Sequence, residues 1–252
     1  MDTLFFKKLG LGYPLICLHG YALDHTIWLK TASEMQSGIN FILPDLRGHG
    51  RSYTPDGNYT MQSMAEDVLR VMDSLMLNKA FLAGHSMGGY ISLAMAKNHP
   101  DRLSGLALVA SHPFADNPEK KKSRFEESKK VRLSKSTDPI IGMAQKLSKK
   151  LEVINLCKSL ISKTSIICVV GVLAGMADRL DMVNVMNTMN LPAFLIAGTD
   201  DQLIPTTTVD KMALKIPAMR IERIDHAGHM PMLEQPAETA AALLKFITQV
   251  RK

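Results

Sequence analysis

Short apolar runs recur along the chain and are separated by segments with helical periodicity. The runs lie at residues 4–6, 15–18, 41–43, 80–83, 106–109, 194–197 and 220–224. Most of them are continuous instead of alternating, which is typical of strands buried on both faces of a parallel sheet. Helical patterns cover residues 60–76, 89–98, 206–215 and 237–250. The alternation predicts an α/β fold in which helices flank a mostly parallel sheet.

Residues 112–189 break this alternation. Only residues 166–170 look strand-like there, and the rest is rich in Lys, Ser, Met and Leu and predicts several helices. Gly171 and Gly175 weaken the helix prediction at the end of the segment. We therefore predict a core made of residues 1–111 and 190–252, with a helical cap subdomain, residues 112–189, inserted between two strands.

Composition adds constraints on location and partners. The formal net charge of +6 is concentrated in residues 120–163, where Lys and Arg clearly outnumber Asp and Glu. Phe125 is the one aromatic residue in the segment, which argues against single-stranded nucleic acid and favours a solvated helix face. The three cysteines, Cys17, Cys157 and Cys168, show no disulfide spacing, so we expect reduced thiols and a cytoplasmic protein. The apolar run at residues 166–177 falls short of the roughly 20 residues that span a bilayer.

The strongest chemical signal is the segment Gly84-His85-Ser86-Met87-Gly88-Gly89, which follows an apolar strand and opens an apolar helix. A tight strand-to-helix turn crowds the backbone, so positions two residues on either side of its apex must be small. Gly84 and Gly88 meet that condition. The turn would expose Ser86 at the carboxyl end of the sheet, facing the free N–H groups of the new helix. We predict that Ser86 is a nucleophile.

A serine hydroxyl needs a general base, and the base needs an acid that fixes its tautomer. Asp200 and Asp201 follow one predicted strand, and His226 and His229 follow the last one. The chain order Ser, Asp, His is the order found in α/β-hydrolases. The residues alone leave both aspartates open as candidates.

Two backbone groups are candidates for stabilising an oxyanion. The strand at residues 15–18 runs into His19-Gly20-Tyr21, where Gly20 permits a tight turn. The N–H of Tyr21 could then join the N–H of Met87, the residue after the nucleophile. The histidines match no compact zinc or two-metal spacing, and the sequence contains no dinucleotide fingerprint or P-loop, so we expect neither metal nor cofactor.

Five segments together resemble the α/β-hydrolase superfamily across nearly the whole chain. They are HGYALDHTIW (19–28), PDLRGHGRS (44–52), GHSMGG (84–89), GTDDQLIP (198–205) and GHMPMLEQP (228–236). The resemblance implies Ser86 as nucleophile, His229 as base and Asp201 as acid, with segment 44–52 forming a structural loop near the site. Few residues precede His19, so the first strand of the family's sheet is expected to be missing, which leaves about seven.

Within the superfamily, the size and the cap resemble small carboxylesterases, including pimeloyl-carrier-protein methyl esterases, and residues 171–181 are similar to enol-lactonases and haloperoxidase-like members. The leading prediction is therefore a serine esterase acting on a small-molecule ester through an acyl-enzyme. A lactonase or carbon–carbon-bond hydrolase with the same triad and a ligand-sensing receptor on the same fold are the alternatives. The basic cap also raises the possibility of a substrate linked to an acyl carrier protein.

Overall fold

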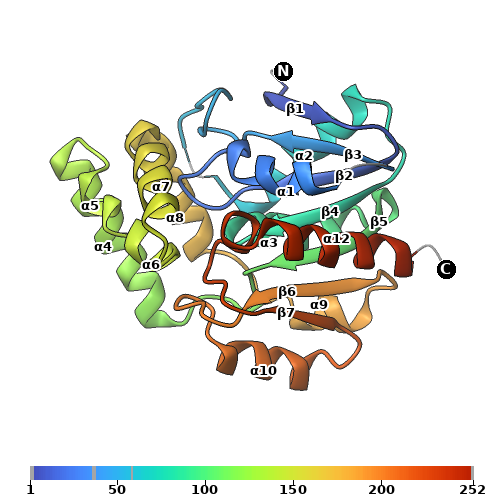
Figure 1. The fold of residues 1–252 in the computed structure, drawn as a ribbon. Helices are drawn as coiled ribbons and strands as arrows, with labels where there is room; N and C mark the ends of the chain where they lie inside the picture. The colour runs from blue at the N-terminus through green and yellow to red at the C-terminus, as the bar shows by residue number, and fades with distance from the viewer. Residues whose placement is uncertain (1–2, 36–37, 58, 251–252) are drawn as a thin grey trace.

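The computed structural model describes residues 3–35, 38–57 and 59–250. Within these ranges one sheet contains seven strands in the order β1-β3-β2-β4-β5-β6-β7 (Figure 1). All neighbouring strands pair in parallel except β1 and β3, which are antiparallel. The predicted α/β class and mostly parallel seven-stranded sheet are confirmed. The strands are β1 (Phe6–Leu9), β2 (Tyr13–Leu18), β3 (Ile39–Pro44), β4 (Ala80–His85), β5 (Leu103–Val109), β6 (Ala193–Gly198) and β7 (Arg220–Ile224).

The continuous apolar runs mark the interior strands well, because those strands are covered on both faces. Every residue of β4 is buried, and so is all of β5 except Ser104. The first strand differs from its prediction, since it spans Phe6–Leu9 and not residues 4–6. As an edge strand it carries the exposed Lys7 and Lys8, so an apolar run does not mark it.

Helices cover both faces of the sheet. On one face α1 (Leu29–Glu34) packs against α12 (Pro236–Val250), and on the other α2 (Met61–Ser74) packs against α3 (Met87–Asn98). The side chain of Thr60 caps α2 by accepting a hydrogen bond from the Ser63 N–H at 3.0 Å. Shorter elements complete the core: η1 (His25–Trp28), η2 (Pro100–Arg102), α9 (Val183–Thr188), α10 (Thr206–Lys215) and α11 (Pro231–Glu234).

Five helices between β5 and β6 gather at one end of the sheet (Figure 1). They are α4 (Pro118–Ser134), α5 (Asp138–Ile141), α6 (Ala144–Leu147), α7 (Leu151–Lys163) and α8 (Ile166–Ala177). The sixth helix of this insertion, α9, lies instead beside the core, where the Asn187 side chain donates to the Lys215 carbonyl of α10 at 2.9 Å. The subdomain boundary at residue 189 therefore remains a prediction.

The ambiguous run at residues 166–170 forms the start of helix α8. The two glycines that weakened the helix prediction allow this helix to contact the core closely. A Cβ atom at Gly175 would lie 1.8 Å from the Tyr59 carbonyl oxygen, and one at Gly171 would lie 2.6 Å from the carbonyl oxygen of Gly57. The glycines are thus a packing requirement between cap and core, which sequence periodicity cannot reveal.

The length and polarity of each helix determine whether it could span a membrane. Across the described ranges, no individual helix is long and apolar enough to cross a bilayer. Helices α7 and α8 meet the length and composition criteria only when taken together, and the pair is bent by 104°.

Candidate active site

Ser86 lies at the junction of β4 and α3 in a left-handed backbone conformation, with φ 50° and ψ −113°. Such a conformation is strained for a residue with a Cβ and is held only by its surroundings. A Cβ at Gly84 would lie 2.3 Å from the Gly88 carbonyl oxygen, and one at Gly88 would lie 2.7 Å from the Leu18 carbonyl oxygen. The two glycines thus permit the close backbone approach that the sharp turn at Ser86 requires.

The backbone of Ser86 is tied to strand β5 and to the residues that follow it. Its N–H donates to the Val109 carbonyl at 3.0 Å, and its carbonyl oxygen accepts a hydrogen bond from Ser111 Oγ at 2.7 Å. The sequence analysis did not identify Ser111. Its position two residues after the end of the neighbouring strand is the only signal that could have pointed to it.

His229 and Asp201 form a buried pair. His229 Nδ1 lies 2.8 Å from Asp201 Oδ2, and both side chains are almost fully buried. Asp201 Oδ1 accepts two further hydrogen bonds, from the N–H groups of Leu203 at 2.8 Å and Ile204 at 3.0 Å. The carboxylate is therefore fixed in place. Because it accepts the Nδ1 proton, the lone pair of His229 is on Nε2.

The structure separates the two aspartates and the two histidines that the sequence placed together. Asp200 lies at the surface, with its carboxylate 3.5 Å from the Lys149 ammonium group. His226 is also exposed, and its backbone has a φ of 57°. Neither residue contributes to the buried His229–Asp201 pair.

His85 connects the Ser86 turn to the loop that carries His229. Its Nε2–H donates to the His229 carbonyl oxygen at 2.9 Å, and the two imidazole rings are 5.0 Å apart. Burial lowers the pKa of His85 well below its usual range, so the ring is neutral. Sequence reasoning missed this residue, although its place directly before Ser86 could have drawn attention to it. Over the described residues, no hydrogen bond joins Ser86 Oγ to His229, and such bonds are often long before a substrate binds.

The turn at His19-Gly20-Tyr21 lies against the same site. A Cβ at Gly20 would lie 2.8 Å from His85 Nδ1 and 3.3 Å from the Ser86 Cβ. In the ranges that the structure describes, the N–H groups of Tyr21 and Met87 have no hydrogen-bond partner. The two predicted oxyanion donors are thus available for a ligand beside Ser86.

Two buried histidines position this turn. His19 Nε2 accepts the Leu46 N–H at 2.9 Å, and His49 Nε2 accepts the Ala22 N–H at 3.2 Å. Burial lowers the pKa of both rings, that of His49 to about 3, so both can act as neutral acceptors.

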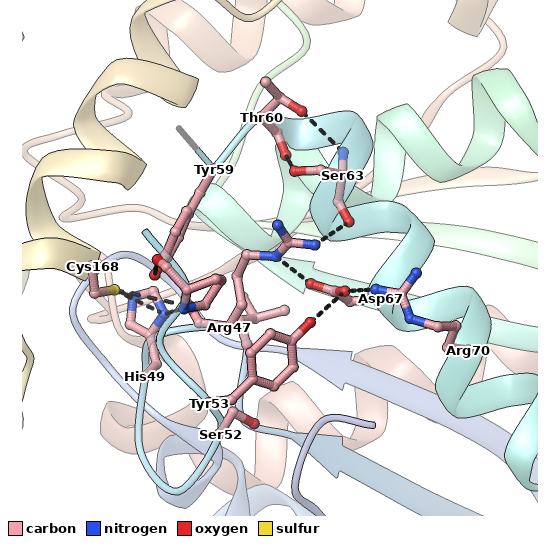
Figure 2. Close-up of polar contacts among 12 residues, drawn as sticks. Arg47, His49, Ser52, Tyr53, Tyr59, Thr60, Ser63, Asp67, Arg70 and Cys168 are labelled. Carbon is pink, nitrogen blue, oxygen red and sulfur yellow. Dashed lines mark hydrogen bonds and ion pairs between the residues drawn. The ribbon is translucent and has the colours of Figure 1, made fainter. Parts of the chain in front are cut away.

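The loop at residues 44–52 is in turn bound to both the core and the cap (Figure 2). Arg47 pairs with the buried Asp67 of α2 and donates to the Ser63 carbonyl at 2.9 Å. His49 Nδ1 lies 3.5 Å from the Cys168 sulfur of α8 (Figure 2). The hydrogen bonds of Leu46 with His19 and of His49 with Ala22 hold this loop against the turn at His19-Gly20-Tyr21.

One cluster near this loop has the residue types of a metal site. Ligand atoms of Asp24, His25 and Asp45 lie within 4.8 Å of one another. Asp45 already accepts hydrogen bonds from His25 Nδ1 at 2.7 Å, from the His25 N–H at 2.9 Å and from the Arg51 N–H at 2.9 Å. Protein donors occupy both oxygens of Asp45. The cluster is therefore better explained as a set of hydrogen bonds that stabilise the loops around His25 and Arg51.

Comparison with known proteins adds independent information. The family model of the alpha/beta hydrolase fold matches residues 13–129. An esterase structure from Thermogutta terrifontis, with malate bound, is similar over 99% of this chain and 94% of that one, with 32% identity and a TM-score of 0.93.

Two curated proteins are also similar. The AB hydrolase superfamily protein YisY of Bacillus subtilis is 40% identical over 111 residues, which cover 43% of this chain and only 41% of YisY. A pimeloyl-[acyl-carrier protein] methyl ester esterase of Aromatoleum aromaticum is 24% identical over 91% of this chain and 96% of that protein. The shared sheet, the family model and the full-length match to the Thermogutta esterase establish that this chain belongs to the α/β-hydrolase superfamily.

Proposed function

We propose that the protein is a serine hydrolase that cleaves carboxylic esters through an acyl-enzyme. The observation that carries this proposal is the strained turn at Ser86 next to the buried His229–Asp201 pair. In this assignment Ser86 is the nucleophile, His229 is the general base and Asp201 orients the imidazole.

The reaction follows from these positions. His229 Nε2 takes the Ser86 proton as Oγ attacks the ester carbonyl, and the N–H groups of Tyr21 and Met87 bind the resulting oxyanion. When the tetrahedral intermediate collapses, the carbon–oxygen bond to the alcohol breaks and the imidazolium gives its proton to the leaving alkoxide. His229 then deprotonates a water molecule, which hydrolyses the acyl-Ser86 ester and restores the free hydroxyl.

Two of the similar proteins support an ester substrate. The Thermogutta protein is described as an esterase, and its similarity extends over almost the full length of both chains. The Aromatoleum protein is described as an esterase of a methyl ester on an acyl-carrier protein.

A panel of p-nitrophenyl esters with short and medium acyl chains tests the proposal. We expect many turnovers per protein molecule, because a complete triad regenerates its nucleophile after each acylation. The measurement is the release of p-nitrophenol against time. A single burst equal to the protein concentration, with no turnover afterwards, would support a ligand-sensing receptor and contradict an esterase.

The basic surface of the cap supports a more specific substrate, an acyl group carried by an acidic protein. Helix α4 presents the exposed Lys122, Lys129 and Lys130 on the subdomain next to the site. Electrostatic steering increases association rates and weakens as ionic strength rises, since the Debye length is about 10 Å at 0.1 M salt.

We therefore expect kcat/KM for an ester linked to acyl carrier protein to fall steeply from low to high salt, while the free methyl ester of the same acid shows a flat profile. Reversing the charges in Lys129→Glu/Lys130→Glu should lower kcat/KM for the linked ester about tenfold or more at low salt. The control is Lys79→Glu. Lys79 is an exposed lysine near the C-terminal end of α3, whereas Ser86 lies at the N-terminal end of that helix. Identical salt profiles for the two esters would contradict a carrier-protein partner.

A further inference from the structure

The two peptide groups that contain the proposed oxyanion donors have their carbonyl oxygens hydrogen-bonded by buried side chains. The N–H of Met87 belongs to the peptide group that also contains the Ser86 carbonyl. The N–H of Tyr21 belongs to the peptide group of the Gly20 carbonyl. In a planar trans peptide the C=O and the N–H point in opposite directions, and no described peptide bond is cis. A contact that fixes either carbonyl therefore also fixes the direction of the N–H across from it.

Ser111 holds the first of these carbonyls. Ser111 is fully buried, and its hydroxyl donates to the Ser86 oxygen at 2.7 Å. The same oxygen accepts the N–H of Gly89 at 2.9 Å. Two donors thus fix the plane of the peptide group whose N–H is that of Met87.

The residues around Ser111 leave room for this contact. A Cβ at Gly89 would lie 2.2 Å from Ser111 Oγ and 2.6 Å from its Cβ, so a side chain at this position would displace the hydroxyl. Ala110, which joins β5 to Ser111, has a φ of 45°. This left-handed conformation is strained for a residue with a Cβ and persists only where the surrounding structure fixes it. The position of the Ser111 hydroxyl therefore explains the second glycine after Met87, which the tight turn itself does not require.

His19 holds the second carbonyl. Its ring is fully buried, and Nδ1 lies 2.8 Å from the Gly20 oxygen. Since Nε2 accepts the N–H of Leu46 at 2.9 Å, the proton of the neutral ring is on Nδ1. Nδ1–H therefore donates to the carbonyl of the peptide group that contains the Tyr21 N–H. The N–H of Leu23 is a second donor to this oxygen, at 3.3 Å.

A hydrogen bond to a carbonyl also strengthens the N–H of the same peptide group as a donor. Linked hydrogen bonds polarise one another, and a buried site screens this effect less than water does. The negative oxygen of an ester reaction develops only on the way to the tetrahedral intermediate. Stronger donors therefore lower the barrier without tightening the binding of the uncharged ester.

We infer that Ser111 and His19 are positioning residues for the oxyanion site, because their side chains orient and polarise the two peptide groups that bind the oxyanion. This inference rests on the proposed esterase function and adds two residues that act through backbone amides instead of touching the reacting atoms. Loss of either side-chain donor should weaken the binding of a negatively charged tetrahedral adduct. The binding of an uncharged carbonyl compound should change little.

Two ketones of similar shape separate these two states. With butyl trifluoromethyl ketone, a bond forms between Ser86 Oγ and the carbonyl carbon, the Ser86 proton passes to His229, and the carbonyl oxygen becomes the oxyanion. Butyl methyl ketone binds without this addition. The readout is the ratio of the two inhibition constants, measured against hydrolysis of p-nitrophenyl butyrate.

We expect Ser111→Ala to lower the preference for the trifluoromethyl ketone about tenfold, the scale of one buried hydrogen bond. The same variant should lower kcat by a similar factor and change KM by less than about twofold. A loss that affects the binding of both ketones alike, or an unchanged ratio, would overturn the positioning role.

The matched control is Ser92→Ala. Ser92 is equally buried and donates to the Gly88 carbonyl at 2.8 Å in the same helix, α3. The N–H of that peptide group belongs to Gly89 and is already bonded to the Ser86 carbonyl, so it is not an oxyanion donor. We expect the control to keep the ketone ratio of the wild type.

His19→Gln tests the second peptide group. Its terminal amide replaces Nε2 and not Nδ1, so it can still meet the Leu46 N–H while the donor to the Gly20 oxygen is lost. We expect the ketone ratio to fall as it does in Ser111→Ala. A wild-type ratio in His19→Gln would contradict the role of His19.

A spectroscopic measurement on the free protein separates this inference from the esterase proposal. The ¹⁵N resonance of the Met87 amide, assigned in protein labelled with ¹⁵N-methionine by its loss in Met87→Leu, reports the polarisation of that peptide group without any substrate. Loss of the Ser111 hydrogen bond should move the resonance upfield, and Ser92→Ala should leave it in place. An upfield shift supports the positioning role even if the wild type hydrolyses no ester. An unmoved resonance in Ser111→Ala overturns it even if esters are hydrolysed.

Discussion

Replacement of the Ser86 hydroxyl, in Ser86→Ala, is expected to lower ester turnover by about three orders of magnitude or more. The attack on the carbonyl requires Oγ, and no other hydroxyl is held at the apex of the turn between β4 and α3 in the described chain. Alanine keeps the Cβ and therefore the same backbone constraint at φ 50°. The measurement is steady-state hydrolysis of p-nitrophenyl butyrate, together with a thermal melt that should show an unchanged transition.

The matched control is Ser123→Ala, which removes an exposed hydroxyl from α4. It should retain the activity of the wild type, because Ser123 contacts none of the proposed catalytic groups. Retention of a tenth of the wild-type activity by Ser86→Ala would show that Ser86 is not the nucleophile.

The second large expected effect is a loss of activity that distinguishes His229 from His226 and Asp201 from Asp200. His229→Ala and Asp201→Asn should each lower kcat by about three to four orders of magnitude, because removing one member of a triad disables the unit. The amide introduced by Asp201→Asn can donate an N–H to Nδ1, which favours the tautomer with its proton on Nε2 and removes the lone pair that accepts the Ser86 proton.

The adjacent residues provide the comparison. His226→Ala and Asp200→Asn should stay within about tenfold of the wild type, since both side chains lie at the surface and outside the buried pair. The same ester panel measured on all four variants decides the assignment. If Asp200→Asn were the inactive variant instead, Asp201 would not be the acid and its hydrogen bond to His229 would have only a structural role.

The fold and the turn at Ser86 could be predicted from the sequence, because both depend on residues that are close together in the chain. An interior strand of a parallel sheet needs apolar side chains on both faces, so β4 and β5 appear as uninterrupted apolar runs. The turn at Ser86 needs small residues at fixed offsets, which Gly84 and Gly88 display directly. The edge strand β1 obeys neither rule, and its start was therefore predicted too early, at residue 4 instead of Phe6.

The other features of the candidate site depend on contacts between residues that are far apart in the chain. Asp200 and Asp201 are adjacent and chemically identical, and only the fold brings Asp201 to 2.8 Å from His229 while it leaves Asp200 at the surface. The hydrogen bond from His85 to the His229 carbonyl joins residues 144 positions apart.

The sequence by itself determined the α/β class, the succession of strands along the chain and the serine at the tight turn, because each depends on neighbouring residues and their periodicity. Only the tertiary structure showed which aspartate contacts the histidine and why α8 contains glycines. Those features depend on distances between segments far apart in the chain. Side-chain burial and hydrogen-bond partners exist only once the cap has packed onto the core.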